Sequence, residues 1–270
     1  VFVLVGTSLV TFLIANGIEE ILTAEPLKSQ KDQVQQDRQA HKRITKQHAR
    51  RYLTMGILVD LIPLLLLKYS NFFISTINIL LRREFLPTFR FLLPLGISFY
   101  TLQAISYLAD VYRGKQRADR NFARFLLYMS FFPQIVQGPI PRHGMLADQL
   151  YAKHSYDYRR ITHGAQLILW GWIKKLVIAD RLAIPVDFVF NYYWNNHGFV
   201  IFFGALLYSI QIYADFSGGM DIASGVAEIF GISLTENFRQ PYFSRSVEEF
   251  WRRWHITLGA WMRDYVFYPL

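Results

Sequence analysis

The sequence has 270 residues, of which 52% are hydrophobic and 17% aromatic, a composition too apolar for an average soluble domain of this length. The net charge is +9, but the Lys and Arg residues stand in short clusters between apolar stretches, which argues against the basic face of a nucleic-acid-binding protein. The absence of Cys excludes disulfide scaffolds, Cys-based zinc sites and thiol nucleophiles from this stretch. We therefore expect membrane lipid, and no nucleic acid, as a partner.

The first predicted elements are apolar segments separated by a basic one. Residues 1–18 and 52–69 approach the roughly 20 apolar residues that a bilayer-crossing helix needs. Residues 25–51 lie between them and are rich in Lys and Arg, which predicts a basic cytoplasmic loop or an interfacial helix. Residues 72–81 are too short for a separate span unless they belong to a long, tilted helix.

The middle of the chain carries signals for bent and broken helices. Residues 91–111 form a third predicted span, with Pro94 and Gly96 placed to break or bend its entry. Residues 122–140 are also apolar, but this stretch contains or is followed by Pro133, Gly138, Pro139 and Pro141. Because proline cannot donate a backbone hydrogen bond, we expect a re-entrant or broken segment here and not one straight helix.

Two further spans are predicted at residues 162–178 and 199–213, with an external loop between them that contains no Lys or Arg. Residues 213–231 are apolar but interrupted by acidic and small residues, and ionisable groups at membrane depth usually face a protein interior or an aqueous cavity. The sequence thus predicts an all-α, polytopic integral membrane protein with one membrane-embedded domain over residues 1–270. Both ends lie in apolar runs, so we expect this domain to be incomplete at both ends.

The strongest chemical signal is the stretch VEEFWRRWHITLGAWMRDYVFYPL, which begins at Val247. Read as one helix, it places Trp251, Trp254 and His255 on one face. Desolvation among large rings favours a neutral imidazole, which can accept a proton from an attacking hydroxyl. A lone histidine on an apolar face is more often a hydrogen-bonded core residue. The polar segments YADFSGGMDIASG and TENFRQPYF nearby favour the functional alternative.

Other kinds of site lack support in the sequence. No HExxH pair, G-x-S-x-G elbow, Walker motif or Rossmann glycine pattern occurs, so we expect no metal. Arg239, Arg245 and Arg253 would suit phosphate or carboxylate binding, and would equally suit snorkelling to the membrane interface.

Four stretches, in order, resemble signature segments of the membrane-bound O-acyltransferase family, in particular its branch of alginate O-acetyltransferases and related bacterial polysaccharide acetylation proteins. Each alone is a weak signal, but all four in this order within a helical membrane chain are specific. They are LPLGISFYTLQAISYLADVYRG, FFPQIVQGPIPR, YADFSGGMDIASGVAEIFGI and ENFRQPYFSRSVEEFWRRWHITLGAWMRDYVFYPL, which begin at Leu93, Phe131, Tyr213 and Glu236.

The resemblance implies many helices around a thinned central core, where a cytoplasmic acyl donor meets an acceptor reached from outside. It implies transfer of an acetyl group from acetyl-CoA towards an exported, alginate- or cellulose-like polysaccharide at the cell membrane. The acceptor would be the polysaccharide or an extracytoplasmic acetyltransferase. Two alternatives stay open: D-alanyl transfer to teichoic acid from a carrier protein, and a non-catalytic transporter or export scaffold.

The resemblance also implies roles for individual residues. His255 corresponds to one of two histidines associated with activity; the second, in a later Trp-His-Gly-like stretch, has no counterpart here, so His255 is either the principal base or its supporting partner. The residues that would bind substrate or line the central cavity are Asp215, Ser217, Asp221, Asn237, Arg239, Trp251, Arg253, Arg263 and Asp264. The residues that would form a re-entrant wall are Gln137, Gly138, Pro139 and Arg142.

Overall fold

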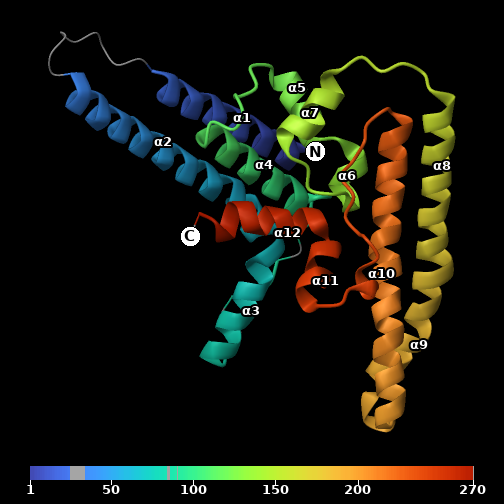
Figure 1. Cartoon of the computed structure of the whole chain (residues 1–270). Helices are drawn as coiled ribbons and strands as arrows, with labels where there is room; N and C mark the ends of the chain where they lie inside the picture. The colour runs from blue at the N-terminus through green and yellow to red at the C-terminus, as the bar shows by residue number, and fades with distance from the viewer. Residues whose placement is uncertain (25–33, 84–85, 90, 270) are drawn as a thin grey trace. The chain divides into compact units, whose positions relative to one another are not determined.

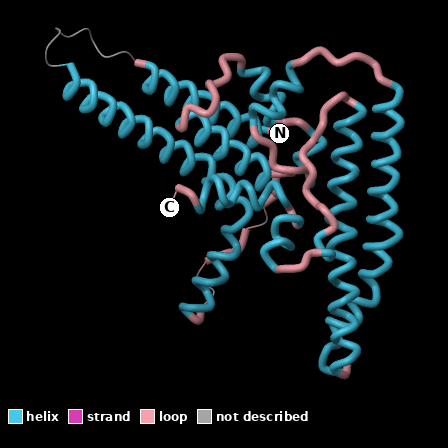
Figure 2. The backbone as a smooth tube through the Cα atoms, viewed as in Figure 1, coloured by secondary structure: helices cyan, strands magenta, loops and turns pink. Residues whose placement is uncertain are grey.

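The computed structural model describes residues 1–24, 34–83, 86–89 and 91–269, and side chains in 34–42 and at position 136 are left aside. Every regular element in these ranges is a helix (Figures 1 and 2). The predicted all-α class is confirmed. Three of the described helices are long and apolar enough to cross a membrane: Phe2–Thr23, Arg43–Leu81 and Gly198–Ile229.

The chain divides into two compact units. The first comprises Val1–Phe131 and Arg142–Asp148, and the second comprises Phe132–Pro141 and Gln149–Leu270. Nothing in the sequence marks this division, because no polar or low-complexity linker separates the parts. That residues 1–270 act as a single acyltransferase domain stays a prediction.

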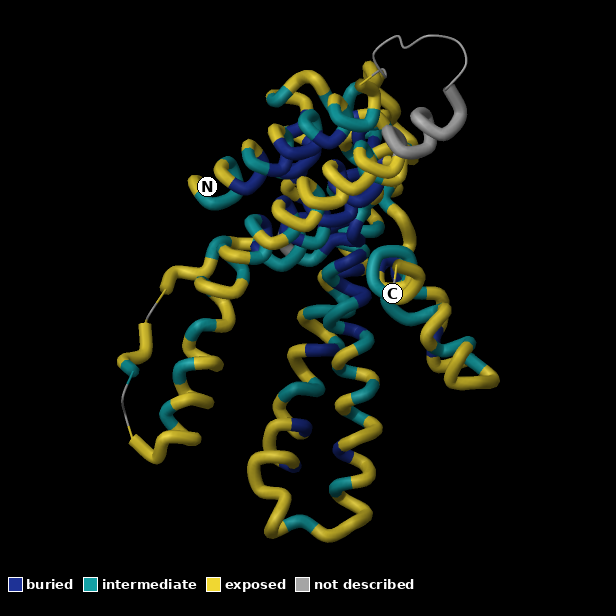
Figure 3. Tube along the Cα trace, turned by 90° about the vertical axis from the view of Figure 1, so that its left-hand side faces the viewer, coloured by how far each residue is buried: buried dark blue, intermediate teal, exposed yellow. Residues whose placement is uncertain are grey.

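The first unit packs α1 (Phe2–Thr23), α2 (Val34–Leu64), α4 (Ile97–Tyr112) and α5 (Phe122–Met129) together with the start of α7 (His143–Tyr151). Its core is aromatic, with Tyr107, Phe125 and Tyr128 fully buried. The buried stretches of the chain are dark blue in Figure 3. One polar pair lies in this core: Thr11 donates a hydrogen bond to the buried carboxylate of Asp60, 3.1 Å from each oxygen. The bond supplies the buried carboxylate with a partner.

Of the two conformations expected for residues 25–51, a basic loop or an interfacial helix, α2 shows the helical one over residues 34–51. Residues 25–33 lie outside the described residues, but the chain is helical from Val34, so residues 34–51 are the first part of α2. Gln, Ala, Lys and Arg are good helix formers, and no Gly or Pro interrupts them. After Pro63 the helix passes through a π-helical turn, Leu65–Tyr69, into α3 (Ser70–Leu81). The short stretch 72–81 is therefore the end of one long helix.

The break predicted between residues 122 and 141 is confirmed. Helix α5 ends at Met129, α6 (Phe132–Gln137) follows, and residues 138–142 are not helical. Pro139 and Pro141 have no backbone N–H to donate, so the helix cannot continue past Gly138 with regular bonding.

The second unit is built on a pair of long helices. Helix α8 (Tyr158–Trp172) continues through a π-helical segment, Ile173–Ala179, into α9 (Asp180–Asn191), and α10 (Gly198–Ile229) returns beside it (Figure 1). Both are longer than the predicted spans 162–178 and 199–213. In particular, α10 continues past the predicted end at residue 213 and carries the acidic and small residues of 213–229 on its surface.

Glycines hold α8 and α10 close together. Gly164 and Gly171 of α8 lie opposite Gly225 and Gly218 of α10, and a Cβ added to any of the four would come 2.5–2.8 Å from the carbonyl oxygen of its opposing glycine. Small residues at such positions let two helix backbones approach closely, as is common in membrane helix pairs.

The remainder of the second unit is irregular and then helical. Helix α10 is followed by an extended segment and a 3₁₀ turn, Pro241–Phe243. Two short helices, α11 (Val247–Arg253) and α12 (Ile256–Met262), lead into a π-helical turn, Arg263–Phe267.

Candidate functional site

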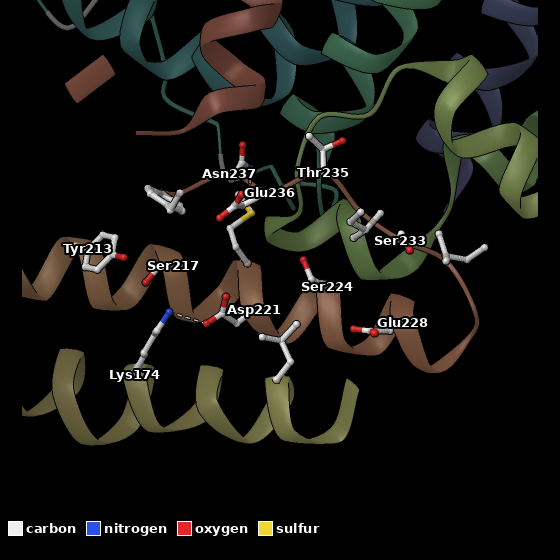
Figure 4. Close-up of a pocket in the computed structure, with 15 residues that line it drawn as sticks. Lys174, Tyr213, Ser217, Asp221, Ser224, Glu228, Ser233, Thr235, Glu236 and Asn237 are labelled. Carbon is white, nitrogen blue, oxygen red and sulfur yellow. Dashed lines mark hydrogen bonds and ion pairs between the residues drawn. The ribbon is translucent and has the colours of Figure 1, made fainter. Parts of the chain in front are cut away.

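A cavity of about 350 Å³ lies in the second unit, lined by the α8 helix and its π-helical extension, by α10, and by residues 232–238 (Figure 4). Because α10 is a candidate membrane span, polar groups on it are expected to face such an interior space. The polar residues that line the cavity are Lys174, Tyr213, Ser217, Asp221, Ser224, Glu228, Ser233, Thr235, Glu236 and Asn237.

Two lysines balance the two predicted acidic residues of α10. Lys174 Nζ donates to Asp221 Oδ2 at 2.6 Å, and both side chains are largely buried. Lys175 pairs with Asp215, and its Nζ also lies 3.4 Å from an oxygen of Asp180. The acidic groups on this helix therefore have cations directly opposite, which reduces the cost of holding them at membrane depth.

Ser217 lies between these acidic residues on α10. The residue is 2% exposed, and its hydroxyl has no hydrogen-bond partner among the described residues. Leaving a buried polar group unpaired costs about 1–3 kcal/mol. Ser217 therefore presents an unused donor and acceptor at the cavity wall.

Asn237 connects the cavity wall to the start of α12. Its Oδ1 accepts hydrogen bonds from the backbone N and the hydroxyl of Thr257, at 2.8 and 2.7 Å. Its carbonyl oxygen accepts from the backbone N of Ile256 at 3.0 Å. The Thr257 hydroxyl in turn accepts from the backbone N of Ile140 at 3.1 Å. One buried amide thus ties together the first turn of α12 and the segment that follows α6.

His255 lies at a chain reversal, and the prediction of one helix from Val247 through His255 is wrong. Helix α11 ends at Arg253, and His255 adopts a left-handed conformation with φ 46° and ψ 55° directly before α12. This conformation is uncommon for a residue with a Cβ and persists only where surrounding bonds impose it. Here Asn237 bonds the two residues that follow His255, and Phe238 pairs with Trp254 in an isolated β-bridge.

The His255 ring is held in apolar surroundings. It packs edge-on against Phe216, with ring centroids 4.7 Å apart, and Phe216 packs in turn against Phe238. Burial lowers the pKa of His255 to about 4. Its Nδ1 is buried without a hydrogen-bond partner in the described part of the chain. At physiological pH this imidazole is neutral and can take part in one more hydrogen bond or proton transfer.

The structure brings together only some of the predicted site residues. Ser217, Asp221 and Asn237 line the cavity, while Arg239 and Arg253 form ion pairs with Glu236 at 2.6 Å and Glu249 at 2.5 Å. The predicted residues that do not line this cavity are Asp215, Arg239, Trp251, Arg253, His255, Arg263 and Asp264. Their roles in binding or catalysis stay predictions.

The predicted re-entrant wall is divided between the two units. Gln137, Gly138 and Pro139 belong to the second unit, where the Gln137 amide lies against α10 so closely that a Cβ on Gly219 would come 2.4 Å from its Oε1. Arg142 belongs to the first unit, where its carbonyl oxygen accepts backbone hydrogen bonds in the first turn of α7.

Sequence reasoning missed Lys174, since it treated residues 162–178 as an ordinary span. A signal was present, because an ammonium group within an apolar helix requires a partner and α10 offers Asp215 and Asp221. No group of three or more His, Asp or Glu side chains suited to a metal ion occurs in the described ranges.

Comparison with known proteins adds the family to this geometry. The model of the membrane-bound O-acyltransferase family matches residues 113–270, more than half of the chain. The chain belongs to this family. Together with its three long apolar helices, this membership makes the chain part of a multi-pass membrane protein.

The names of curated relatives of the chain describe three activities. The probable alginate O-acetylase AlgI of Pseudomonas syringae pv. tomato is 43% identical over 225 residues, which cover 82% of this chain and 43% of the relative. The peptidoglycan O-acetyltransferase of Helicobacter pylori is 35% identical over 249 residues, 83% of this chain and 47% of the relative. The teichoic acid D-alanyltransferase of Bacillus subtilis is 34% identical over 179 residues, which cover 64% of this chain and 44% of the relative. The chain spans less than half the length of each.

Proposed function

We propose that the protein containing this chain transfers an acetyl group from acetyl-CoA towards an exported polysaccharide at the cell membrane. The observation that carries the proposal is His255, a half-buried, neutral imidazole in a constrained turn, whose buried Nδ1 has no hydrogen-bond partner among the described residues. The identity to O-acetylating relatives, 43% and 35% over more than four fifths of the chain, supports acetyl as the group transferred.

The reaction needs a base because a free hydroxyl is a weak nucleophile. An imidazole accepts the proton of the acceptor hydroxyl as its oxygen attacks the thioester carbonyl, and the proton then passes to the departing thiolate of CoA. A general base works best with a pKa near the working pH, and the pKa of His255 lies well below neutrality. His255 therefore acts as the base itself or orients the acceptor hydroxyl for a second histidine.

The alternative of D-alanyl transfer from a carrier protein is supported by the 34% identity to the Bacillus subtilis enzyme, over a smaller share of the chain. The two functions differ in donor, since one uses free acetyl-CoA and the other a protein-bound thioester. The acceptor in the acetyl case is the polysaccharide or an extracytoplasmic acetyltransferase that completes the modification.

The test uses the full-length protein in lipid nanodiscs, with CoA release from acetyl-CoA and label transfer from an alanyl-carrier protein measured in parallel. We expect CoA release in the presence of acceptor, and its loss by at least a hundredfold in His255→Gln. The matched control is His197→Gln, at an exposed position before α10, which should retain activity. Normal turnover by a folded His255→Gln protein would contradict the role of His255, and transfer from the carrier alone would favour D-alanylation.

A further inference from the structure

The cavity in the second unit carries carboxylate groups that each already have one hydrogen-bond partner. Three carboxylates line it, and each has one oxygen bonded to a cationic or imidazole side chain, while none of the described residues bonds the other oxygen. The pairs are Asp221 with Lys174 at 2.6 Å, Glu228 with His163 at 2.9 Å and Glu236 with Arg239 at 2.6 Å. The second oxygens are left as acceptors for hydrogen-bond donors.

An independent observation indicates a ligand. The Ser217 side chain lines the same cavity, is 2% exposed, and makes no hydrogen bond within the described ranges. In Figure 4 it lies on α10 between Tyr213 and Asp221. A hydroxyl from a ligand in the cavity would satisfy it and recover the cost of leaving it unpaired.

These groups define the chemistry of a fitting ligand. An anion would meet three carboxylates, and the two cations beside them, Lys174 and Arg239, are already engaged. A cation at Asp221 would compete with Lys174. A neutral group that donates several hydrogen bonds fits instead. Tyr213 and Phe238, with ring centroids 5.8 Å apart, add aromatic surface at the wall. The volume of about 350 Å³ lies within the range of small-molecule sites.

We propose that this cavity binds an uncharged, polyhydroxylated saccharide unit, with its hydroxyls bonded to Ser217 and to the second oxygens of Asp221, Glu228 and Glu236. The choice of a carbohydrate rests on the proposed function, whereas the preference for a neutral donor of hydrogen bonds rests on the cavity alone. The phosphates of acetyl-CoA bind elsewhere, because here they would face the carboxylates.

The test measures the affinity of the full-length protein in nanodiscs for cellobiose, a neutral disaccharide, and for a mannuronate disaccharide, its anionic counterpart. We expect cellobiose to bind at least tenfold more tightly at low salt. Ser217→Ala should weaken cellobiose binding about threefold to tenfold, as expected for one lost buried hydrogen bond. Ser209→Ala is the matched control: Ser209 is on the same helix, bonds Ala205 within that helix and does not line the cavity.

Absence of cellobiose binding, equal affinities for the two disaccharides, or an unchanged affinity in Ser217→Ala would overturn the proposal. Acetyl-CoA turnover measured on the same samples separates it from the proposed function. Cellobiose binding that Ser217→Ala weakens, in a protein without acetyl transfer, supports the cavity assignment and contradicts the enzyme. Acetyl transfer in a protein that shows no saccharide binding supports the enzyme and contradicts the cavity assignment.

Discussion

The left-handed turn at His255 depends on an amide from another segment, so Asn237 is the residue that most directly tests it. Asn237→Ala removes the acceptor of two hydrogen bonds from Thr257 and leaves a buried backbone N–H unpaired. We expect the free energy of unfolding to fall by about 2 kcal/mol and acetyl-CoA turnover to fall more than tenfold as the His255 ring loses its fixed orientation.

The measurement is thermal unfolding together with initial rates in the full-length protein. Asn195→Ala, on the exposed 3₁₀ turn before α10, serves as the control and should change neither. An Asn237→Ala protein with normal turnover would show that the turn does not position His255 for the reaction.

His143 in the first unit links stability to pH. Its ring lies 4.5 Å from that of Tyr128, and its Nδ1 is 2.8 Å from the amide of Gln116. Burial lowers its pKa to about 4, against the opposing influence of Asp119 and Asp148. An unfolded histidine has a pKa near 6.5, so between these values the unfolded chain binds a proton that the folded chain does not.

The contribution of His143 to stability is therefore fully present above about pH 6.5 and is lost as the pH falls towards about 4. We expect His143→Gln to reduce the acid dependence of the unfolding free energy by up to roughly 3 kcal/mol over this range. Denaturant titrations of both proteins at several pH values measure this, and parallel pH profiles would contradict it.

The sequence indicated which residue types could take part in chemistry, but it did not indicate their backbone conformation. His255 was predicted as a candidate proton acceptor, whereas its left-handed turn depends on hydrogen bonds from Asn237, some twenty positions earlier, that no local pattern reveals. Lys174 was missed for a related reason, because its significance depends on Asp221 of a neighbouring helix.

At the scale of helices, the α8–α10 pair depends on glycine contacts. A Cβ at Gly171 would lie 2.6 Å from the carbonyl oxygen of Gly218, so Gly171→Ala should push the helices apart. We expect a loss of at least 2 kcal/mol of stability and a lower melting temperature of the full-length protein. Gly6→Ala on α1, where a Cβ meets nothing within 4 Å, is the control and should be neutral or mildly stabilising. Equal melting temperatures would show that the pair tolerates separation.

The positions of helices were predicted better than their ends. Apolar length located the first span, and Pro and Gly located the start of α4 after Gly96 and the break after α5. The acidic residues within 213–231 were expected to face a protein interior or a cavity, and on α10 Asp221 and Asp215 pair with Lys174 and Lys175 of the neighbouring helix. Residues 34–51 were assigned to a loop or surface helix for their charge, whereas helix propensity decided their backbone conformation.

At the scale of the whole molecule, the net charge of +9 should affect the affinity for the proposed acyl donor, acetyl-CoA. Long-range attraction for the anionic phosphates of acetyl-CoA should weaken as the Debye length falls from about 10 Å at 0.1 M salt to about 3 Å at 1 M. We expect the KM of the full-length protein for acetyl-CoA to rise several-fold over this range. S-acetyl-pantetheine lacks the nucleotide phosphates, so its KM should stay nearly constant. The same salt dependence for both donors would exclude steering by charge.

The all-α membrane class followed from composition at this scale, while the division into two units did not. The boundary passes through the stretch FFPQIVQGPIPR, which the sequence presents as one continuous motif, with Phe131 and Arg142 in the first unit and the residues between them in the second. Contacts with segments distant in the sequence decide to which unit each of these residues belongs.

The ion pairs between Lys174, Lys175 and the aspartates of α10 also bear on how the protein is made. A carboxylate or ammonium group in the middle of a lone inserting helix costs about 2.5–3.5 kcal/mol on insertion scales. The ribosome completes the lysine-bearing helix first, so the counter-ions of Asp215 and Asp221 already exist in the nascent chain when α10 enters the bilayer. Insertion of α10 is therefore coupled to the preceding helix that carries Lys174 and Lys175. A nascent chain truncated after Ala179 would hold both lysines in an apolar helix without the aspartates that pair with them.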